Sequence, residues 1–321
     1  MREVIYILLF VLLAFSISPA QTAVGDIQDE PIKIEAQPTK GFAYPYYLYV
    51  PKAMRQIGAR KQTQTILVIP NNTGKVDDDF AVHEANVKRQ IERNGTMTAR
   101  LSVIILMPVF PRPGTDWKIY THALDRDSML TDKKEYSRFD LHLAAMIDNA
   151  REKLKAVKLK TDKRVLMLGF SASAMFVNRF TFLHPKRIKA AVIGSPGGWA
   201  IAPVAAYNRK TLRYPIGVGD FRTVSGADLD MKNLRKVPLF VFLGDGDDND
   251  SVVFGDSYNA EDKDLIFELF GKTPVERWEI SKTLYRESKL QAEFKLYPNV
   301  KHAITEEMFA DIFAFLKKYA G

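Results

Sequence analysis

The amino-acid sequence predicts an α/β fold, with a mostly parallel sheet covered by helices on both faces. Several short runs are apolar throughout, which is typical of strands that are buried on both faces of a sheet. Stretches with helical spacing of apolar residues separate these runs. The alternation continues over roughly 280 residues, as expected for strands joined by crossover helices. The length of 321 residues suits one large domain of this kind, with two small domains as the alternative.

Seven segments are predicted to be strands. The first, 42–50, is rich in aromatic residues, and Pro45 within it favours an edge position because proline cannot donate to a sheet. The last, 292–297, places Glu293 and Lys295 between apolar neighbours, which indicates a half-exposed strand near the sheet edge. The five apolar runs between them span 65–69, 103–107, 165–168, 190–193 and 239–243.

Three helices are predicted most clearly. Apolar residues recur at helical intervals over 137–156, and Ser137 with Asp140 gives a start like a capping box. A second helix covers 79–94 and is expected to stop at Gly95, and the third covers 305–319. The segment 196–236 interrupts the alternation, so we expect a small cap-like insertion over one end of the sheet.

The first 20 residues have the layout of a secretory signal peptide. One Arg precedes an apolar run, and Ser18-Pro19-Ala20 offers small residues for cleavage. The run is about 14 residues, short of the ~20 that cross a bilayer, so we expect no stable membrane insertion after cleavage. An uncleaved anchor is the alternative. Residues 21–40 are polar and predict a leader or linker before a domain over 41–321. This organisation favours a secreted or periplasmic protein.

Composition excludes several kinds of site. The chain has no cysteine, so disulfides, thiolate zinc sites, iron–sulfur clusters and a cysteine nucleophile are excluded. Lys and Arg number 46 against 38 Asp and Glu, a formal charge of +8. The basic residues are spread along the chain, so we expect no nucleic-acid partner.

Ser171 lies in the turn between a predicted strand and the next helix. Gly169 and Ser173 stand two residues before and after it, and small residues there permit the strained turn that exposes a nucleophile. The N-terminus of the helix points at this turn, so the N–H of Ala172 is a candidate oxyanion donor. The rival Ser195 is followed by a proline, which removes the N–H needed at that position. The structural alternative is an ordinary strand-to-helix turn.

A serine nucleophile needs a base, and the base needs a carboxylate that fixes its tautomer. His302 follows the last predicted strand, on a loop at the carboxyl end of the sheet. The strand 239–243 opens into a loop rich in aspartate, and a carboxylate there completes the chain order Ser, Asp, His. The candidates are Asp245, Asp247, Asp248 and Asp250. The histidines expected to be structural are His83, His142 and His184.

From about residue 41 to its end, the chain resembles the α/β-hydrolase superfamily of serine hydrolases. The matching segments are 169–173, 184–198, 237–247 and 297–302. More loosely, it is similar to secreted bacterial esterases and polyhydroxyalkanoate-depolymerase-like enzymes. The resemblance implies Asp247 as the acid, and the Asn72 N–H as the second oxyanion donor with Asn71 next. Ser173 replaces the usual glycine, and a glycine often found shortly before the histidine is absent, departures that concern the substrate range.

Two further groups have alternative interpretations. His122, Asp125 and Asp127 lie on a long loop after 103–107, which either lines the pocket or forms a salt-bridged surface. The aspartates after residue 244 partly imitate a calcium loop. Asp250 takes the place of the required glycine, so we predict no metal site.

Together these residues predict a secreted serine hydrolase that cleaves carboxylic esters through an acyl-enzyme. The substrate would be a small-molecule or polymeric ester, and the mechanism requires no cofactor. A serine peptidase or amidase would use the same triad. The alternative from another class is a non-catalytic binding protein with an α/β-hydrolase-like fold.

Overall fold

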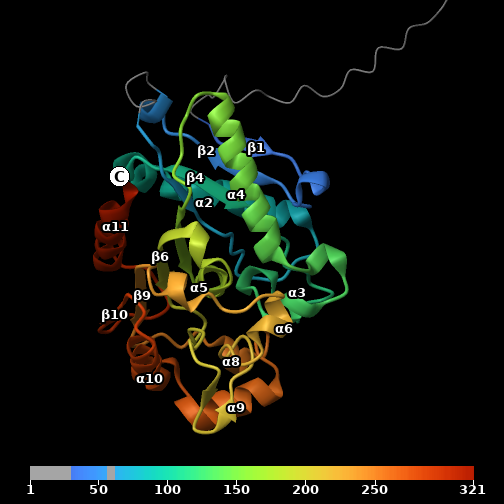
Figure 1. The fold of residues 1–321 in the computed structure, drawn as a ribbon, viewed down its shortest axis with the longest axis vertical. Coiled ribbons are helices and arrows are strands. Elements are labelled where there is room, and N and C mark those ends of the chain that lie inside the picture. Colours follow the sequence, from blue (N-terminus) through green and yellow to red (C-terminus); the bar gives the residue numbers. More distant parts are fainter. Residues whose placement is uncertain (1–29, 56–61) are drawn as a thin grey trace, which may run out of the picture.

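The computed structural model describes residues 30–55 and 62–321 (Figure 1). The predicted signal peptide, residues 1–20, lies outside the described residues, as does the first part of the predicted leader. No helix within the described ranges combines the length and the apolar character needed to cross a bilayer.

The centre of the molecule is an eight-stranded sheet with the order β1-β2-β4-β3-β5-β6-β9-β10. β2 pairs antiparallel with β1 and with β4, and all other pairings in this sheet are parallel. The predicted fold class is confirmed, and each of the seven predicted strands is present. The strands are β1 (Ile32–Ile34), β2 (Tyr46–Tyr49), β3 (Ile66–Val68), β4 (Ile104–Pro108), β5 (Val165–Phe170), β6 (Ile188–Gly194), β9 (Leu239–Gly244) and β10 (Ala292–Tyr297).

Of the two segments predicted to lie at the edges of the sheet, 42–50 and 292–297, only the second forms an edge strand. β10 is an edge strand, as its alternating polarity predicts. The edge position predicted for 42–50 is wrong, because β1 pairs outside β2 with Ile32 opposite Leu48. Pro45 precedes the paired residues, so its missing N–H breaks no bond of the ladder. Since β1 lies within 21–40, three residues of the predicted linker belong to the sheet.

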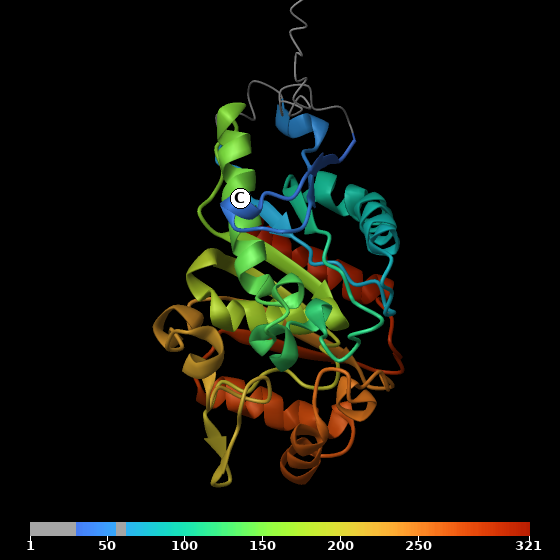
Figure 2. The ribbon, with the colours of Figure 1, turned by 90° about the vertical axis from the view of Figure 1, so that its right-hand side faces the viewer.

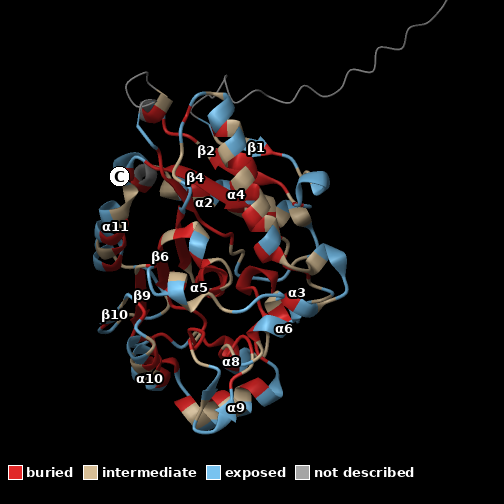
Figure 3. Ribbon diagram, viewed as in Figure 1, coloured by how far each residue is buried: buried red, intermediate tan, exposed pale blue. Residues whose placement is uncertain are grey.

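Helices cover both faces of the sheet (Figure 2). On one face α2 (Phe80–Leu101) and α11 (Glu306–Ala320) pack on an apolar cluster that includes Leu67. On the other, α4 (Phe139–Ala156) and α5 (Ala172–Leu183) pack on a cluster that includes its neighbours Ile66 and Val68. Adjacent residues of one strand thus face opposite layers, as the pleat of a strand requires. The central strands are buried and the outer helix faces are exposed (Figure 3).

Two helix boundaries differ from the prediction. α4 begins at Phe139 after Arg138, which has φ 55° and provides no side-chain cap. The predicted capping box is absent because the Asp140 carboxylate accepts hydrogen bonds from Arg138 and His184 instead. α2 continues through Gly95 to Leu101. Leu101 is buried in the sheet-side cluster, and this packing offsets the cost of about 1 kcal/mol for a glycine within a helix.

The segment 196–236 packs on the helices that follow β9. Its hairpin, β7 (Ala206–Tyr207) and β8 (Lys210–Thr211), lies with α9 at one end of the molecule (Figure 1). Trp199 of this segment stacks on Phe270 of α9, with ring centroids 4.2 Å apart. A separate apolar cluster joins the segment to α8, α9 and α10. The remaining helices are η2 (Pro38–Lys40), η3 (Lys52–Arg55), η4 (Thr121–Ala123), α3 (Arg126–Leu130), η5 (Lys134–Tyr136), η6 (Pro185–Arg187), α6 (Phe221–Ser225), α7 (Met231–Leu234), α8 (Ser251–Phe254), α9 (Ala260–Phe270) and α10 (Pro274–Glu287).

Candidate active site

Ser171 occupies a sharp turn between β5 and α5. Its backbone has φ 62° and ψ −130°, a conformation that costs free energy for a residue with a side chain. The Ser171 N–H donates to the carbonyl of Gly194 at 2.9 Å, and the Ser171 carbonyl accepts from Ala174 at 2.9 Å. These bonds hold the strained turn, and the half-buried serine lies at the N-terminus of α5.

The two small residues beside Ser171 serve different purposes. A Cβ atom on Gly169 would lie 2.3 Å from the carbonyl oxygen of Ser173, so only glycine fits there. The Ser173 hydroxyl accepts from the Phe170 N–H at 3.0 Å and lies 2.9 Å from the Phe170 carbonyl oxygen, to which it can donate. Ser173, which replaces the usual second glycine, therefore stabilises the turn through hydrogen bonds to the backbone of Phe170.

His302 and Asp247 are in direct contact. Nδ1 of His302 lies 3.0 and 2.9 Å from the two carboxylate oxygens of Asp247. The imidazole also packs on the ring of Phe170, with centroids 4.8 Å apart. Because a carboxylate accepts hydrogen bonds only, Nδ1 carries a proton and Nε2 of the neutral ring presents a lone pair. This is the tautomer that a general base for a serine requires.

The environment of Asp247 keeps its carboxyl group ionised. Burial opposes ionisation, but hydrogen bonds from His302 and from the Asn249 N–H, with the nearby Ser195 hydroxyl, outweigh it and lower the pKa of Asp247. Ser195 itself is 2% exposed, so its hydroxyl is closed to substrate.

The other aspartates of this loop have different roles. Asp245 is exposed and accepts the Asn299 N–H at 2.7 Å, and Asp248 is exposed. Asp250 forms a buried ion pair with Arg277, with two N–H···O bonds of 3.0 and 2.8 Å. Of the four candidates, the structure brings only Asp247 to His302.

Removal of the Asp250 carboxylate is expected to destabilise the protein strongly. The side chains of Asp250 and Arg277 are 4% and 1% exposed, so Asp250→Ala leaves a buried cation unpaired. Breaking such a pair typically costs about 3–5 kcal/mol in the free energy of unfolding, which urea denaturation would measure. The double variant Asp250→Ala/Arg277→Leu should recover part of the loss. A change below about 1 kcal/mol in the single variant, the level of an exposed pair, would contradict this account.

The two predicted oxyanion donors lie at the ends of neighbouring strands. Ala172 is the first residue of α5, and Asn72 follows β3, which pairs with β5. Neither backbone N–H has an acceptor among residues 30–55 and 62–321. The Asn72 carbonyl accepts from the Gln90 side chain at 3.1 Å, and its Oδ1 accepts from Gly74 at 3.0 Å. These bonds fix the loop while the Asn72 N–H stays free.

Asn71 and His122 support this loop from beneath. Asn71 Nδ2 and His122 Nε2 lie 2.9 and 2.7 Å from the carbonyl oxygen of Phe110, and the Phe110 N–H donates to Asn71 Oδ1 at 3.0 Å. Burial lowers the pKa of His122 to about 3, so the ring is neutral. Both side chains are fully buried. The sequence makes both possible pocket residues, with a salt-bridged surface as the alternative for the His122 loop, whereas the structure encloses both side chains under this loop.

Asn71→Ala is expected to reduce turnover without removing any group that would touch substrate. The change breaks the bonds to both backbone groups of Phe110 and leaves buried partners unsatisfied, a loss of about 2–3 kcal/mol in stability. We expect kcat for an ester to fall about 10- to 100-fold, with KM within a few-fold, because the donor loop loses its support. The control is Asn72→Ala, which keeps the backbone N–H. Equal kcat values for the two variants would contradict the assignment.

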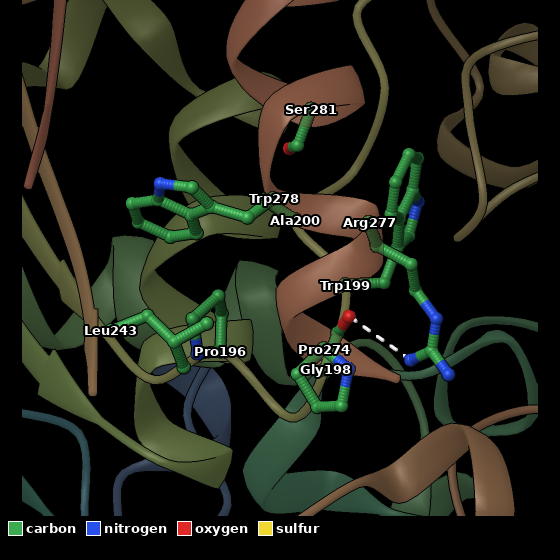
Figure 4. A pocket seen from close by; sticks show the side chains of 9 residues that line it. All are labelled: Pro196, Gly198, Trp199, Ala200, Leu243, Pro274, Arg277, Trp278 and Ser281. Atoms are coloured by element: carbon green, nitrogen blue, oxygen red, sulfur yellow. Dashed lines mark hydrogen bonds between the residues drawn. The ribbon is translucent and has the colours of Figure 1, made fainter. Parts of the chain in front are cut away.

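Two cavities are lined in part by helices and loops that follow β9. One of about 330 Å³ is lined by charged residues, among them Lys118, Asp127 and Lys263. Asp125 also lines this cavity, and burial raises its pKa to about 7. The second, between the segment 196–236 and α10, holds only about 20 Å³ (Figure 4). It has room for about one water molecule, so it offers no pocket for a substrate.

His83, His142 and His184 make contacts that stabilise the fold. His83 Nδ1 lies 2.6 Å from the Thr73 hydroxyl, and His184 Nε2 lies 2.9 Å from Asp140. His142 Nδ1 lies 3.2 Å from the Ala43 backbone nitrogen. No group of three or more His, Asp or Glu side chains in the described part of the chain is arranged to hold a metal ion.

The side chain of Asn249 lies between Ser171 and His302, a position that the sequence does not predict. The Asn249 amide nitrogen lies 2.7 Å from His302 Nε2 and 3.5 Å from Ser171 Oγ. Asn249 stands two residues after Asp247, and the Asn249 N–H donates to Asp247 Oδ1 at 3.0 Å. The sequence signal that could have found it is this short distance from the acid, in a turn that an aspartate side chain closes.

Comparison with known proteins defines the fold family. No family model matches this chain, and no curated protein matches it. Among solved structures, it is similar to poly(aspartic acid) hydrolase-1 from Sphingomonas sp. KT-1, with 18% identity, a TM-score of 0.58, and coverage of 92% of this chain and 99% of that one. A poly(3-hydroxybutyrate) depolymerase from Bordetella parapertussis has 15% identity, a TM-score of 0.55, and coverage of 92% and 91%. An S-formylglutathione hydrolase from Agrobacterium tumefaciens has 11% identity, a TM-score of 0.51, and coverage of 92% and 98%.

These similarities extend over nearly the whole described chain. With the strand order of the sheet and the turn at Ser171, they show that the chain has the α/β-hydrolase fold. The resemblance predicted from the sequence is confirmed for the fold.

Proposed function

We propose that this protein is a serine hydrolase that cleaves carboxylic esters through a Ser171–His302–Asp247 triad. The observation that carries the proposal is the contact of His302 Nδ1 with both oxygens of Asp247, beside a serine in a strained turn at a helix N-terminus. A surface histidine has no need of a buried carboxylate, and an ordinary turn has no need of a positive φ at serine.

The first half of the reaction forms an acyl-enzyme. Ser171 Oγ attacks the ester carbonyl carbon while its proton passes to His302 Nε2. The carbonyl oxygen becomes an oxyanion, which the backbone N–H groups of Ala172 and Asn72 stabilise. Asp247 stabilises the imidazolium through Nδ1–H. The tetrahedral intermediate then collapses, the C–O bond to the alcohol breaks, and Nε2–H gives its proton to the leaving alkoxide.

The second half releases the acid. A water molecule gives a proton to His302 Nε2 as it attacks the acyl carbon, and the same N–H groups hold the second oxyanion. Collapse of this intermediate returns the proton from Nε2 to Ser171 Oγ. The carboxylic acid leaves, and no cofactor takes part.

A peptidase or amidase on the same residues is the second candidate. It is supported by the similarity to a poly(aspartic acid) hydrolase, whereas the names of the depolymerase and of the S-formylglutathione hydrolase favour ester-like substrates. Two of these three names refer to polymers, so the proposed substrates include polymeric as well as small-molecule esters. The signal-peptide layout of residues 1–20 supports a secreted or periplasmic location.

Hydrolysis of p-nitrophenyl acetate and butyrate, beside an aminoacyl p-nitroanilide, tests the proposal. We expect ester turnover to exceed anilide turnover. If a fluorophosphonate labels the protein and only the anilide is hydrolysed, the peptidase or amidase function is favoured. A folded sample that shows neither turnover nor labelling would favour the alternative of a non-catalytic binding protein with this fold.

A further inference from the structure

We propose that Asn249 is a resting-state lock on the proposed active site, an inference that rests on the proposed function. Its side-chain amide nitrogen lies at hydrogen-bond distance from His302 Nε2, 2.7 Å, and at the outer limit of that distance from Ser171 Oγ, 3.5 Å. The amide must leave these atoms before the serine can transfer its proton to the histidine.

The contact with Asp247 decides which end of the amide faces His302. Nδ1 carries a proton because it lies between two carboxylate oxygens, so Nε2 of the neutral ring is an acceptor. The amide oxygen of Asn249 would face this lone pair with one of its own, which is repulsive. The NH2 group therefore points at Nε2, and its second hydrogen is available to Ser171 Oγ.

This arrangement competes directly with the first step of the reaction. The Nε2 lone pair is the acceptor for the Ser171 proton, and in this structure the amide of Asn249 occupies it. Within the described residues, no hydrogen bond joins Ser171 Oγ to His302 Nε2. A donor aimed at Oγ also withdraws electron density from the nucleophile. The amide thus lowers the fraction of molecules in which Ser171 and His302 are ready to react.

The lock can open by rotation of one side chain. The backbone of Asn249 is fixed, because the Asn249 N–H donates to Asp247 and the next residue, Asp250, is held by Arg277. The Asn249 side chain is half-buried, and its neighbour Asp248 is exposed. Replacing the side chain leaves the backbone bond to Asp247 in place, so Asn249→Ala removes the lock and preserves the turn.

The test is the second-order rate of labelling by a fluorophosphonate, whose uncharged phosphorus centre reacts as an acyl group does. The Ser171 O–H proton passes to His302, the Oγ–P bond forms, and the P–F bond breaks with release of fluoride. We expect Asn249→Ala and Asn249→Ser to react about two- to tenfold faster than the unchanged protein, the effect of one competing hydrogen bond. Hydrolysis of p-nitrophenyl acetate should show a rise in kcat/KM of the same sign.

Asp248→Ala is the matched control, an exposed residue of the same loop, and should label at the rate of the unchanged protein. Equal or slower labelling of both Asn249 variants would overturn the lock, and slower ester turnover with unchanged labelling would assign Asn249 to substrate binding instead. Loss of a residue that only supports the turn is expected to slow labelling, so faster labelling distinguishes the lock from a structural role. Should the alanine variant not fold, the serine variant decides. Absence of labelling in the unchanged folded protein would count against the proposed function itself.

Discussion

Replacement of Ser171 by alanine is expected to abolish ester hydrolysis, with a fall in kcat/KM of about 10⁴-fold or more. The variant removes the hydroxyl that is proposed to form the acyl-enzyme, while the proposed oxyanion donors and the fold remain. The turn should survive, because its backbone bonds to Gly194 and Ala174 do not involve the hydroxyl. Alanine also has a Cβ, so the backbone strain at this position is unchanged and stability should change little. Initial rates with p-nitrophenyl butyrate measure the loss.

Ser195→Ala is the matched control for this change. Ser195 is the rival serine of the sequence, and it is 2% exposed, so substrate cannot reach its hydroxyl. We expect activity within a few-fold of the unchanged protein. Retained turnover in Ser171→Ala with loss in Ser195→Ala would reverse the assignment of the nucleophile.

Replacement of Asp247 by asparagine is expected to have the next largest effect, a fall in kcat of about 10⁴-fold. Asparagine has the same size, but its NH2 group can donate to Nδ1 of His302. The ring proton then moves to Nε2, and the base loses the lone pair that must accept the serine proton. Asp245→Asn and Asp248→Asn are the controls, since neither carboxylate touches His302. Similar losses in all three variants would show that the charge of the loop matters, and not the contact with His302.

The Asp247 carboxyl group should also make the stability of the folded protein decrease at low pH. Its pKa is lowered in the folded protein, mainly because hydrogen bonds to the carboxylate outweigh burial. A lowered carboxyl pKa stabilises the folded state above the unfolded value of about 4, and this contribution disappears as the pH falls through the folded value. The stability difference between the unchanged protein and Asp247→Asn should therefore shrink below about pH 4 in urea denaturation.

The strands of the fold are predictable because burial on both faces leaves a plain pattern. Runs such as 239–243 admit no polar residue, so periodicity and length identify them directly. The edge at β1 is not predictable in this way. Its three paired residues are too few to show a period, and polar neighbours surround them.

The candidate site likewise has features that the sequence predicts and features that depend on the folded structure. The spacing of Gly169, Ser171 and Ser173 follows from steric limits within one turn, which the sequence contains in full. The choice of Asp247 among four aspartates came from family resemblance, because the partner of each carboxylate lies elsewhere in the chain. Arg277 removes Asp250 from the candidates only once α10 is folded against the loop. The bridge made by Asn249 likewise depends on three loops meeting, and no local pattern predicts it.

Burial explains why the positions of His122 and Asn71 are not predictable from the sequence. Both lie next to polar residues in loops, which is typical of pocket walls as well as of buried loop supports. Only the folded structure shows that the carbonyl of Phe110 accepts from both side chains beneath the loop that follows β3.

The most direct test of this account is to label the folded protein with a fluorophosphonate and to locate the adduct by peptide mass spectrometry. The account predicts a single adduct on Ser171, absent from Ser171→Ala and strongly slowed in Asp247→Asn. An adduct on another residue, or an adduct on Ser171 that forms equally fast without the Asp247 carboxylate, would contradict it.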